Sequence, residues 1–135
     1  MQIYPAGSRP SRKAGPDHFT GTVWQDPIIS APDPARINAL RVAFEPGART
    51  AWHWHPYGQT LHVTDGVGLV CLRGEAPRQI RPGDTVWIPP EVEHWHGASP
   101  DVAMVHLALQ EAKDGTPAVW LEHVSDEDYA ITPVG

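Results

Sequence analysis

Hydrophobic and polar residues alternate in short runs along most of this 135-residue chain, and turn residues separate the runs. A two-residue period is typical of strands that bury one face. Pairs such as Pro46-Gly47 and Asp65-Gly66 are typical turn sequences and close the runs. The pattern predicts an all-β chain with strands over residues 18–25, 37–44, 48–55, 60–64, 67–72, 84–88, 102–110 and 118–123.

The two ends of the chain and one internal segment depart from this alternation. Residues 1–16 are polar and punctuated by Pro and Gly, which indicates an N-terminal arm. Pro27 and the prolines that follow it predict a loop after the first strand. Ser125 and the acidic residues after it predict the N-cap and first turn of a short terminal helix. Roughly eight to ten short strands at this spacing indicate a barrel or a two-sheet roll.

Composition limits the class of protein. The 15 Pro and 12 Gly residues are too many for a helical bundle, and the length suits a single domain over residues 1–135. The net charge of -6, without a basic cluster, argues against a nucleic-acid partner or an anionic membrane. No apolar run could span a bilayer or direct export, and Cys71 has no partner for a disulfide. We therefore expect a cytoplasmic protein.

Histidines recur at alternate positions, so strand parity places several of them on shared faces. His53 and His55 are two residues apart and would project from the same face of a strand. His94 and His96 have the same spacing. His106 falls in a later row with Met, Ala and Gln on an apolar face, where it is either a packed core histidine or a functional one.

Gln59 follows a Pro-Tyr-Gly turn that can bring its side chain back toward His53 and His55. If a strand begins near Gln59, His62 lies on the opposite face and is structural or exposed. Imidazoles together with one hard oxygen ligand suit Mn, Fe, Co, Ni or Zn. The candidate ligands of one metal ion are His53, His55, Gln59 and His94.

Two segments carry a family resemblance. Residues 47–66 resemble the first cupin motif, and residues 83–98 resemble the second, with sixteen residues between them. The resemblance implies a cupin fold, that is, a double-stranded β-helix or jelly-roll barrel, and it assigns the same four residues to the metal. Gln59 stands where the family usually has Glu. A neutral amide in place of a carboxylate would leave the ion with its full positive charge.

A narrower resemblance covers most of the chain. The segments PGARTAWHWHPYGQTLHVT, PGDTVWIPPEVEHWHGASP, MVHLALQE and WLEHVSDEDY are similar to the bacterial cupins that act as manganese-dependent (R)-hydroxynitrile lyases. This resemblance implies one divalent metal per chain, with Mn(II) expected first and Fe, Zn, Ni or Co as alternatives. Cupins commonly assemble, so we expect a homo-oligomer, either a dimer or a tetramer. The implied catalytic residues are His106, His96 and Thr50, and the implied substrate-binding residues are Leu40, Val42 and Gln110.

The predicted reaction is the reversible cleavage of a cyanohydrin, a small-molecule substrate, to an aldehyde and cyanide. The metal would stabilise an alkoxide, His106 would remove the hydroxyl proton, and Thr50 would orient the hydroxyl group. Two alternatives stay open, because the fold does not decide the reaction. One is a metal-dependent cupin dioxygenase, and the other is a non-catalytic cupin that binds a small molecule.

Overall fold

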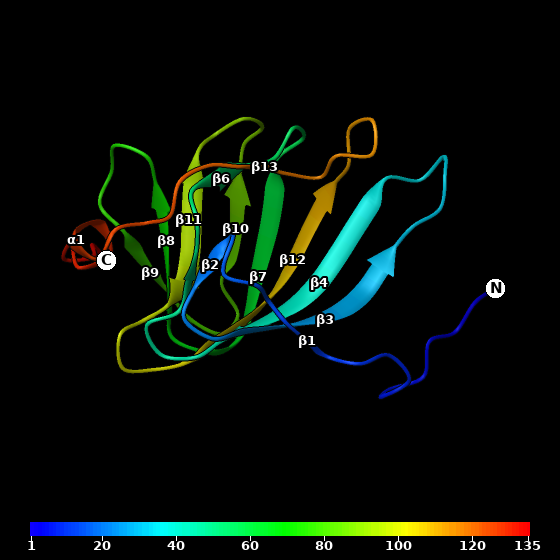
Figure 1. The fold of residues 1–135 in the computed structure, drawn as a ribbon, viewed down its shortest axis with the longest axis horizontal. Helices are drawn as coiled ribbons and strands as arrows, with labels where there is room; N and C mark the ends of the chain where they lie inside the picture. Colours follow the sequence, from blue (N-terminus) through cyan, green and yellow to red (C-terminus); the bar gives the residue numbers. More distant parts are fainter.

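The computed structural model describes residues 1–135, and its strands form two sheets that face each other and curve into a roll (Figure 1). All strand pairs within the two sheets are antiparallel. This arrangement confirms the predicted all-β architecture. The first sheet contains, in spatial order, β1 (Arg12–Lys13), β3 (Val23–Ser30), β4 (Ile37–Phe44), β12 (Met104–Glu111), β7 (Gln59–Gly66) and β10 (Thr85–Ile88).

The second sheet is made of shorter strands, and its central strand β11 contacts three others. The strands of this sheet are β2 (Phe19–Thr20), β5 (Arg49–Thr50), β6 (His53–Trp54), β8 (Gly68–Leu72), β9 (Arg78–Ile80), β11 (His94–Ala98) and β13 (Val119–Trp120).

The chain has no helix with the length and apolar character needed to cross a bilayer.

Strand β3 departs most clearly from the sequence prediction. The loop expected at Pro27 is wrong, since β3 continues through Pro27 to Ser30. Strand β1 pairs with β3 only at Gln25 and Trp24. Beyond those residues no strand pairs with the outer edge of β3, so a proline without an N–H removes no bond from the ladder. The register shift between Pro27 and Ile29 accommodates the proline as a bulge.

Other predicted boundaries were close, and two predicted strands are divided. Strand β4 matches the predicted residues 37–44. The predicted strand over residues 18–25 is split between the two sheets, as β2 and β3, and Gly21 lies at the crossing with a φ of 80°. The predicted strand over residues 48–55 is divided into β5 and β6, which both belong to the second sheet. Within the predicted N-terminal arm, residues 12–13 form β1.

The hydrophobic core lies between the sheets and is built from alternate residues of each strand. Val23, Phe44, Leu61 and Met104 are at most 1 % exposed and belong to this cluster. Burial of such side chains contributes about 1.5–3 kcal/mol each. The core fills only part of the space between the sheets, and polar side chains line the remainder.

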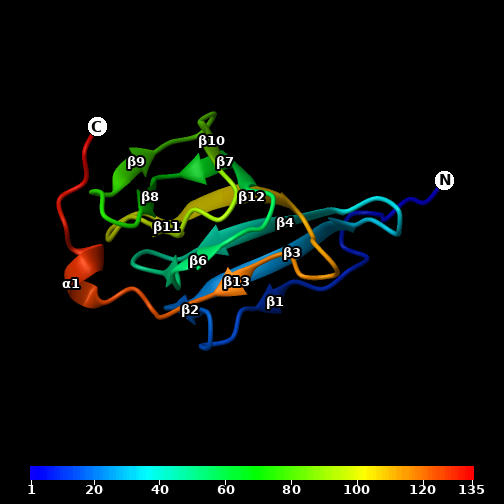
Figure 2. The same ribbon diagram turned by 90° about the horizontal axis from the view of Figure 1, so that it is seen from above.

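A second, smaller cluster lies on the outer face of the second sheet, where Trp95 and Val124 pack near the C-terminal helix. This helix, α1 (Asp126–Tyr129), confirms the predicted cap, because the Ser125 hydroxyl accepts a hydrogen bond from the Asp128 N–H. Buried Arg49 ties the helix down by donating to the Val124 carbonyl and to the Asp126 carboxylate, both at 2.8 Å. Helix α1 and the N-terminal arm lie at opposite ends of the molecule (Figure 2).

Candidate metal and catalytic site

Five histidines from both sheets gather in the polar part of the interior. His53 of β6 pairs directly with His94 of β11, and their ring centroids are 4.3 Å apart. His55 follows β6, with its ring 5.0 Å from that of His53. His96 of β11 and His106 of β12 complete the group, with rings 4.7 Å apart. All five side chains are buried.

Backbone carbonyls hold three of these rings in one tautomer. His53, His55 and His94 each have Nδ1 2.8–2.9 Å from a carbonyl oxygen, which can only accept a hydrogen bond. Each Nδ1 therefore donates, and each Nε2 presents a lone pair to the interior. This arrangement is typical of metal-binding histidines. The carbonyl partners are Ala51, Pro117 and Val92, respectively.

Several of the histidines are close enough to hold one metal ion. Nitrogen atoms of His53, His94 and His96 lie within 4.8 Å of one another. His96 nevertheless differs from the other two, because its Nδ1 bonds the Nε2 of His106 at 2.9 Å rather than a carbonyl. The Nε2 atoms of His55 and His96 are buried without any hydrogen-bond partner. Such atoms are costly to bury unless a ligand or ion satisfies them.

Gln59 adds an oxygen to the group. Its Oε1 lies 3.1 Å from Nε2 of His94, and its Nε2 donates to Gln110 Oε1 at 2.9 Å. Because His94 Nε2 carries a lone pair and no hydrogen, it and Gln59 Oε1 are two acceptors that face each other with no hydrogen between them. A cation beside both atoms removes this conflict, and neighbouring ligands of one ion, at ~2.1 Å each, would be about 3 Å apart. The residues present therefore fit a divalent metal ion.

A glycine places Gln59 at this point. Gly58 has a φ of 84°, and a Cβ there would lie 2.7 Å from the Ile88 carbonyl oxygen. The turn needs a residue without a side chain, and it delivers Gln59 into β7 opposite Ile88. His62 lies on the other face of β7, as expected, and bonds the Thr85 hydroxyl at 2.9 Å.

Burial lowers the pKa of every histidine in the group. The pKa values of His94 and His106 fall to about 4, mainly because the charged ring loses its hydration. Burial, and then the neighbouring imidazoles, hold the pKa values of His53 and His96 well below 6.5. The pKa of His55 is also lowered by burial. The rings are therefore neutral near pH 7 and can accept a cation or a proton.

A cavity of about 140 Å³ opens beside these residues. Thr50, His96 and Gln110 line it, whereas His106, the expected base, does not reach it. The Thr50 hydroxyl accepts a hydrogen bond from the His96 backbone N–H at 3.2 Å. Its apolar wall includes Leu40, Val42, Phe44 and Ala108.

Trp120 of β13 is a cavity residue that sequence reasoning missed. Its ring stacks on His53 at 4.6 Å and on His18 at 4.3 Å, so it fixes the position of the His53 ring. Its ring lies beside the His53 ring because Trp120 of β13 pairs directly with His53 of β6. No local motif surrounds Trp120 or His18, so the sequence contains no signal for this contact.

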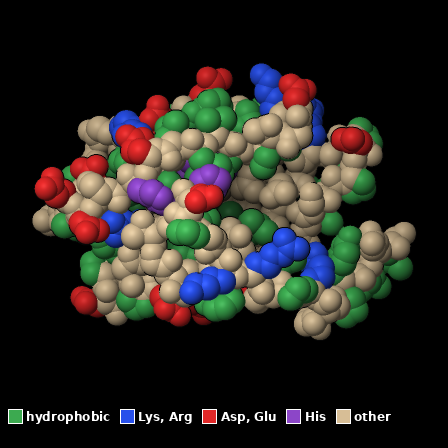
Figure 3. Space-filling model, viewed as in Figure 1, with side chains coloured by type: hydrophobic (Ala, Val, Ile, Leu, Met, Phe, Trp, Pro, Cys, Tyr) green, Lys and Arg blue, Asp and Glu red, His purple; other side chains and the backbone are tan.

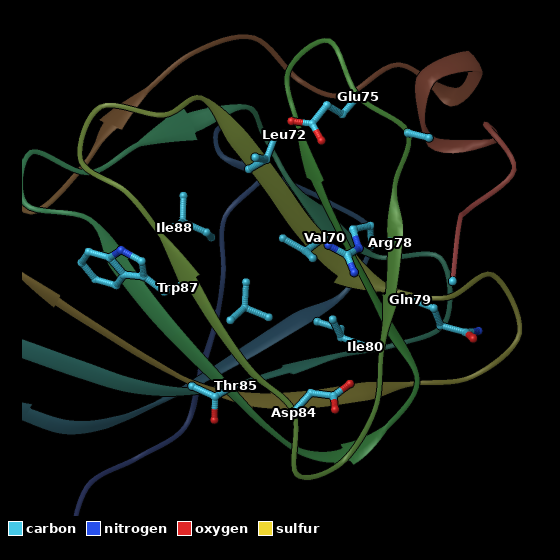
Figure 4. A pocket seen from close by; sticks show the side chains of 13 residues that line it. Val70, Leu72, Glu75, Arg78, Gln79, Ile80, Asp84, Thr85, Trp87 and Ile88 are labelled. Atoms are coloured by element: carbon cyan, nitrogen blue, oxygen red, sulfur yellow. The ribbon is translucent and has the colours of Figure 1, made fainter.

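A larger cavity, of about 490 Å³, lies elsewhere. It occupies the seam between β9 and β10, which are the edge strands of the two sheets and do not pair with each other (Figure 4). Val70, Ile80 and Ile88 line it together with charged residues such as Arg78 and Asp84. It contains no histidine and no buried side-chain atom without a hydrogen-bond partner.

On the face shown in Figure 3, acidic and basic side chains are intermixed at the surface.

Comparison with known proteins gives concordant matches. A model of the cupin domain matches residues 40–109. An (R)-mandelonitrile lyase from Granulicella tundricola is 55 % identical over 129 residues, which cover 96 % of this chain and 98 % of that protein. The crystal structure of a cupin-like protein from Thermotoga maritima is 42 % identical, with a TM-score of 0.82 over 96 % of this chain and 95 % of the other.

A more distant structure shares the fold alone. A polyketide cyclase from Streptomyces resistomycificus is 17 % identical to this chain, with a TM-score of 0.68. The match covers 96 % of this chain and 90 % of the cyclase. The same roll therefore supports different chemistries, and the residues that line the interior must decide the reaction.

Proposed function

This chain belongs to the cupin family, and we propose that it is a metal-dependent lyase that cleaves cyanohydrins reversibly to an aldehyde and cyanide. The observation that carries the proposal is the small apolar cavity beside a group of neutral imidazoles with unpartnered Nε2 atoms. The similarity to an (R)-mandelonitrile lyase over nearly the full chain supports a lyase.

For the metal ligands we propose His53, His55, Gln59 and His94. Each of the three histidines donates from Nδ1 to its own backbone carbonyl, a partner that His96 lacks. Gln59 Oε1 approaches His94 Nε2. A divalent ion, Mn(II) in this proposal, supplies Lewis acidity that lowers the pKa of a hydroxyl group beside it. Because all four ligands are neutral, they leave the charge of the ion undiminished.

We assign the role of proton acceptor to His96, with His106 behind it. His96 lines the cavity with a free Nε2, whereas the Nε2 of His106 already bonds His96 Nδ1. This assignment reverses the order expected from the sequence, in which His106 is the base. When His96 Nε2 takes the hydroxyl proton, its Nδ1–H can donate to His106 and the hydrogen bond stabilises the imidazolium.

The bonds then rearrange within the cavity. The electron pair left on the hydroxyl oxygen forms the C=O bond of the aldehyde, and the C–C bond to the nitrile breaks. Cyanide leaves with the electron pair of the broken C–C bond and takes the proton from His96 to form hydrogen cyanide. The Thr50 hydroxyl, which accepts from the His96 N–H, keeps its own hydrogen free to orient the substrate oxygen. A 150 Å³ apolar cavity holds benzene, so this cavity suits an alkyl or single aryl group.

The proposal is tested by supplying Mn(II)-loaded protein with (R)-mandelonitrile while benzaldehyde, cyanide and dissolved oxygen are measured. We expect equal amounts of benzaldehyde and cyanide and no consumption of oxygen. Oxygen uptake with a cleaved product would instead identify a dioxygenase. Binding of the nitrile without turnover would identify a non-catalytic binding protein.

A further inference from the structure

Three amide side chains form a row across the first sheet, on the face that lines the interior. Gln110 of β12 pairs with Asn38 of β4 on one side and with Gln59 of β7 on the other. Side chains at directly paired positions of antiparallel strands lie next to each other on the same face. Asn38, Gln110 and Gln59 are thus consecutive neighbours, and Gln59 is the member nearest the histidines.

The hydrogen bonds in this row have a fixed direction. The Asn38 backbone carbonyl can only accept, and it lies 3.1 Å from Gln110 Nε2. The same Gln110 nitrogen donates to Asn38 Oδ1 at 2.9 Å. Asn38 therefore engages the NH2 group of Gln110 and turns the Gln110 oxygen toward Gln59, where it accepts from Gln59 Nε2 at 2.9 Å.

The direction of the row decides which atom of Gln59 faces the metal ligands. With its NH2 group donating to Gln110, Gln59 turns Oε1 toward His94 Nε2. The opposite orientation would place the NH2 group, with its partial positive charge, beside the proposed cation. An amide can flip with little change of shape, so only its hydrogen-bond partners select one orientation.

We infer that Asn38 is a positioning residue for the metal centre, because through Gln110 it orients the Gln59 amide with its oxygen toward the ion. The inference rests on the proposed metal site. It also changes the expected role of Gln110, because both ends of its amide are engaged and it therefore holds Gln59 in place rather than binding the substrate. A carboxylate at position 59 would offer no hydrogen to the Gln110 oxygen, so the row favours Gln over Glu there.

The test is the dissociation constant of Mn(II), measured by electron paramagnetic resonance of the free aqua ion. Asn38→Leu removes the Oδ1 acceptor at 2.9 Å at similar volume and leaves Gln110 only the longer bond to the backbone carbonyl, so we expect roughly tenfold weaker binding. Asn38→Asp keeps an acceptor oxygen and should bind within about threefold of the wild type. Ser30→Ala is the control, because Ser30 pairs with Asn38 but lies outside the amide row.

A double variant separates positioning from a general loss of stability. Gln110→Met should also weaken Mn(II) binding by roughly tenfold or more, since Gln59 loses its acceptor. If Asn38 acts through Gln110, adding Asn38→Leu to Gln110→Met should weaken binding no further. Should Asn38→Leu fail to fold by circular dichroism, Asn38→Ala takes its place in the same cycle.

Two results would overturn the inference. One is wild-type affinity in the Asn38 variant that lacks the acceptor, and the other is full additivity of the two substitutions. Failure of the proposed metal site has a different signature, because the wild-type protein would then leave the Mn(II) signal unchanged. Mn(II) affinity that is retained in Asn38→Asp and reduced in Asn38→Leu would support the role of Asn38.

Discussion

The cavity beside the histidines and the cavity at the seam between β9 and β10 differ in how far the polar atoms of their walls find partners. The cavity at the seam between β9 and β10 is more than three times the volume of the one beside the histidines. Its charged residues stand at half-buried or exposed positions, where water can solvate them. The smaller cavity instead adjoins buried imidazole nitrogens without partners.

The difference shows that volume alone does not identify a functional site. A seam between two sheet edges leaves space simply because the strands do not pair. Burying five imidazoles and the amides of Gln59 and Gln110 between the sheets is costly unless the polar atoms meet a ligand, an ion or each other. Of these two cavities, only the smaller one carries this cost, and it is the region where we expect the chemistry.

The largest predicted effect comes from removing a metal ligand. His94→Ala should lower the rate of cyanide release by about a thousandfold, because the Lewis acid contributes several kcal/mol to the transition state. Arg78→Ala, in the larger cavity, should leave the rate unchanged. Steady-state assays of both variants, with metal content measured on the same samples, make the comparison. A loss of activity in the Arg78 variant would move the site to the seam.

A smaller loss should follow when the proton acceptor is removed and the metal stays. His96→Ala should reduce kcat by about a hundredfold, the usual contribution of general base catalysis. His106→Ala should reduce kcat less, because His106 supports His96 without touching the substrate. The assay is turnover at saturating Mn(II), with bound metal confirmed for each variant. A greater loss in the His106 variant would restore His106 as the base.

The histidine cavity should also make the metal-free protein sensitive to acid. The pKa of His106 is lowered to about 4 in the folded state, and the unfolded chain has the ordinary value of 6.5. The unfolded state therefore binds more protons between these values, so stability is present above pH 6.5 and is lost as the pH falls toward 4. His106 alone accounts for about 3 kcal/mol of this loss.

Urea unfolding of metal-free protein at pH 7 and pH 5 checks the acid effect. Mn(II) should protect the folded state, because a metal ion competes with protons for the same nitrogens. Equal free energies of unfolding at the two pH values would show that the buried histidines are not held neutral by the fold.

The smallest predicted effect concerns the size of the substrate. Leu40→Ala truncates a side chain of the apolar wall and so enlarges the cavity. We expect the ratio of kcat/KM for a naphthyl cyanohydrin over that for a phenyl cyanohydrin to rise about tenfold. Ile80→Ala removes a similar volume in the larger cavity and should lower stability without changing this ratio. Competition between the two substrates measures the ratio directly. An altered ratio in the Ile80 variant would contradict the assignment.

Local sequence features predicted much of the fold. Alternation defined β4 to the residue, and the acidic turn after Ser125 predicted α1. The course of β3 past Pro27 could not be foreseen, because a proline is tolerated there only on account of the free edge left by β1. Partners across a sheet depend on long-range pairing, and the sequence pattern contains no information about it.

The same limit applies to the site. The spacing of His53, His55 and Gln59 suggested a common ion, and strand parity added His96. The contacts of Asn38 and Trp120 came instead from strands that are distant in sequence and adjacent in space. The order of His96 and His106 relative to the cavity likewise depends on how β11 and β12 face each other, which parity alone does not determine.

The most direct test of the central claim is cyanide release from (R)-mandelonitrile while Mn(II) is returned to metal-stripped protein. The proposed function predicts that stripped protein is inactive and that activity rises in proportion to bound Mn(II), with saturation at one ion per chain. Full activity in the stripped protein, or no activity at one bound ion per chain, would contradict it.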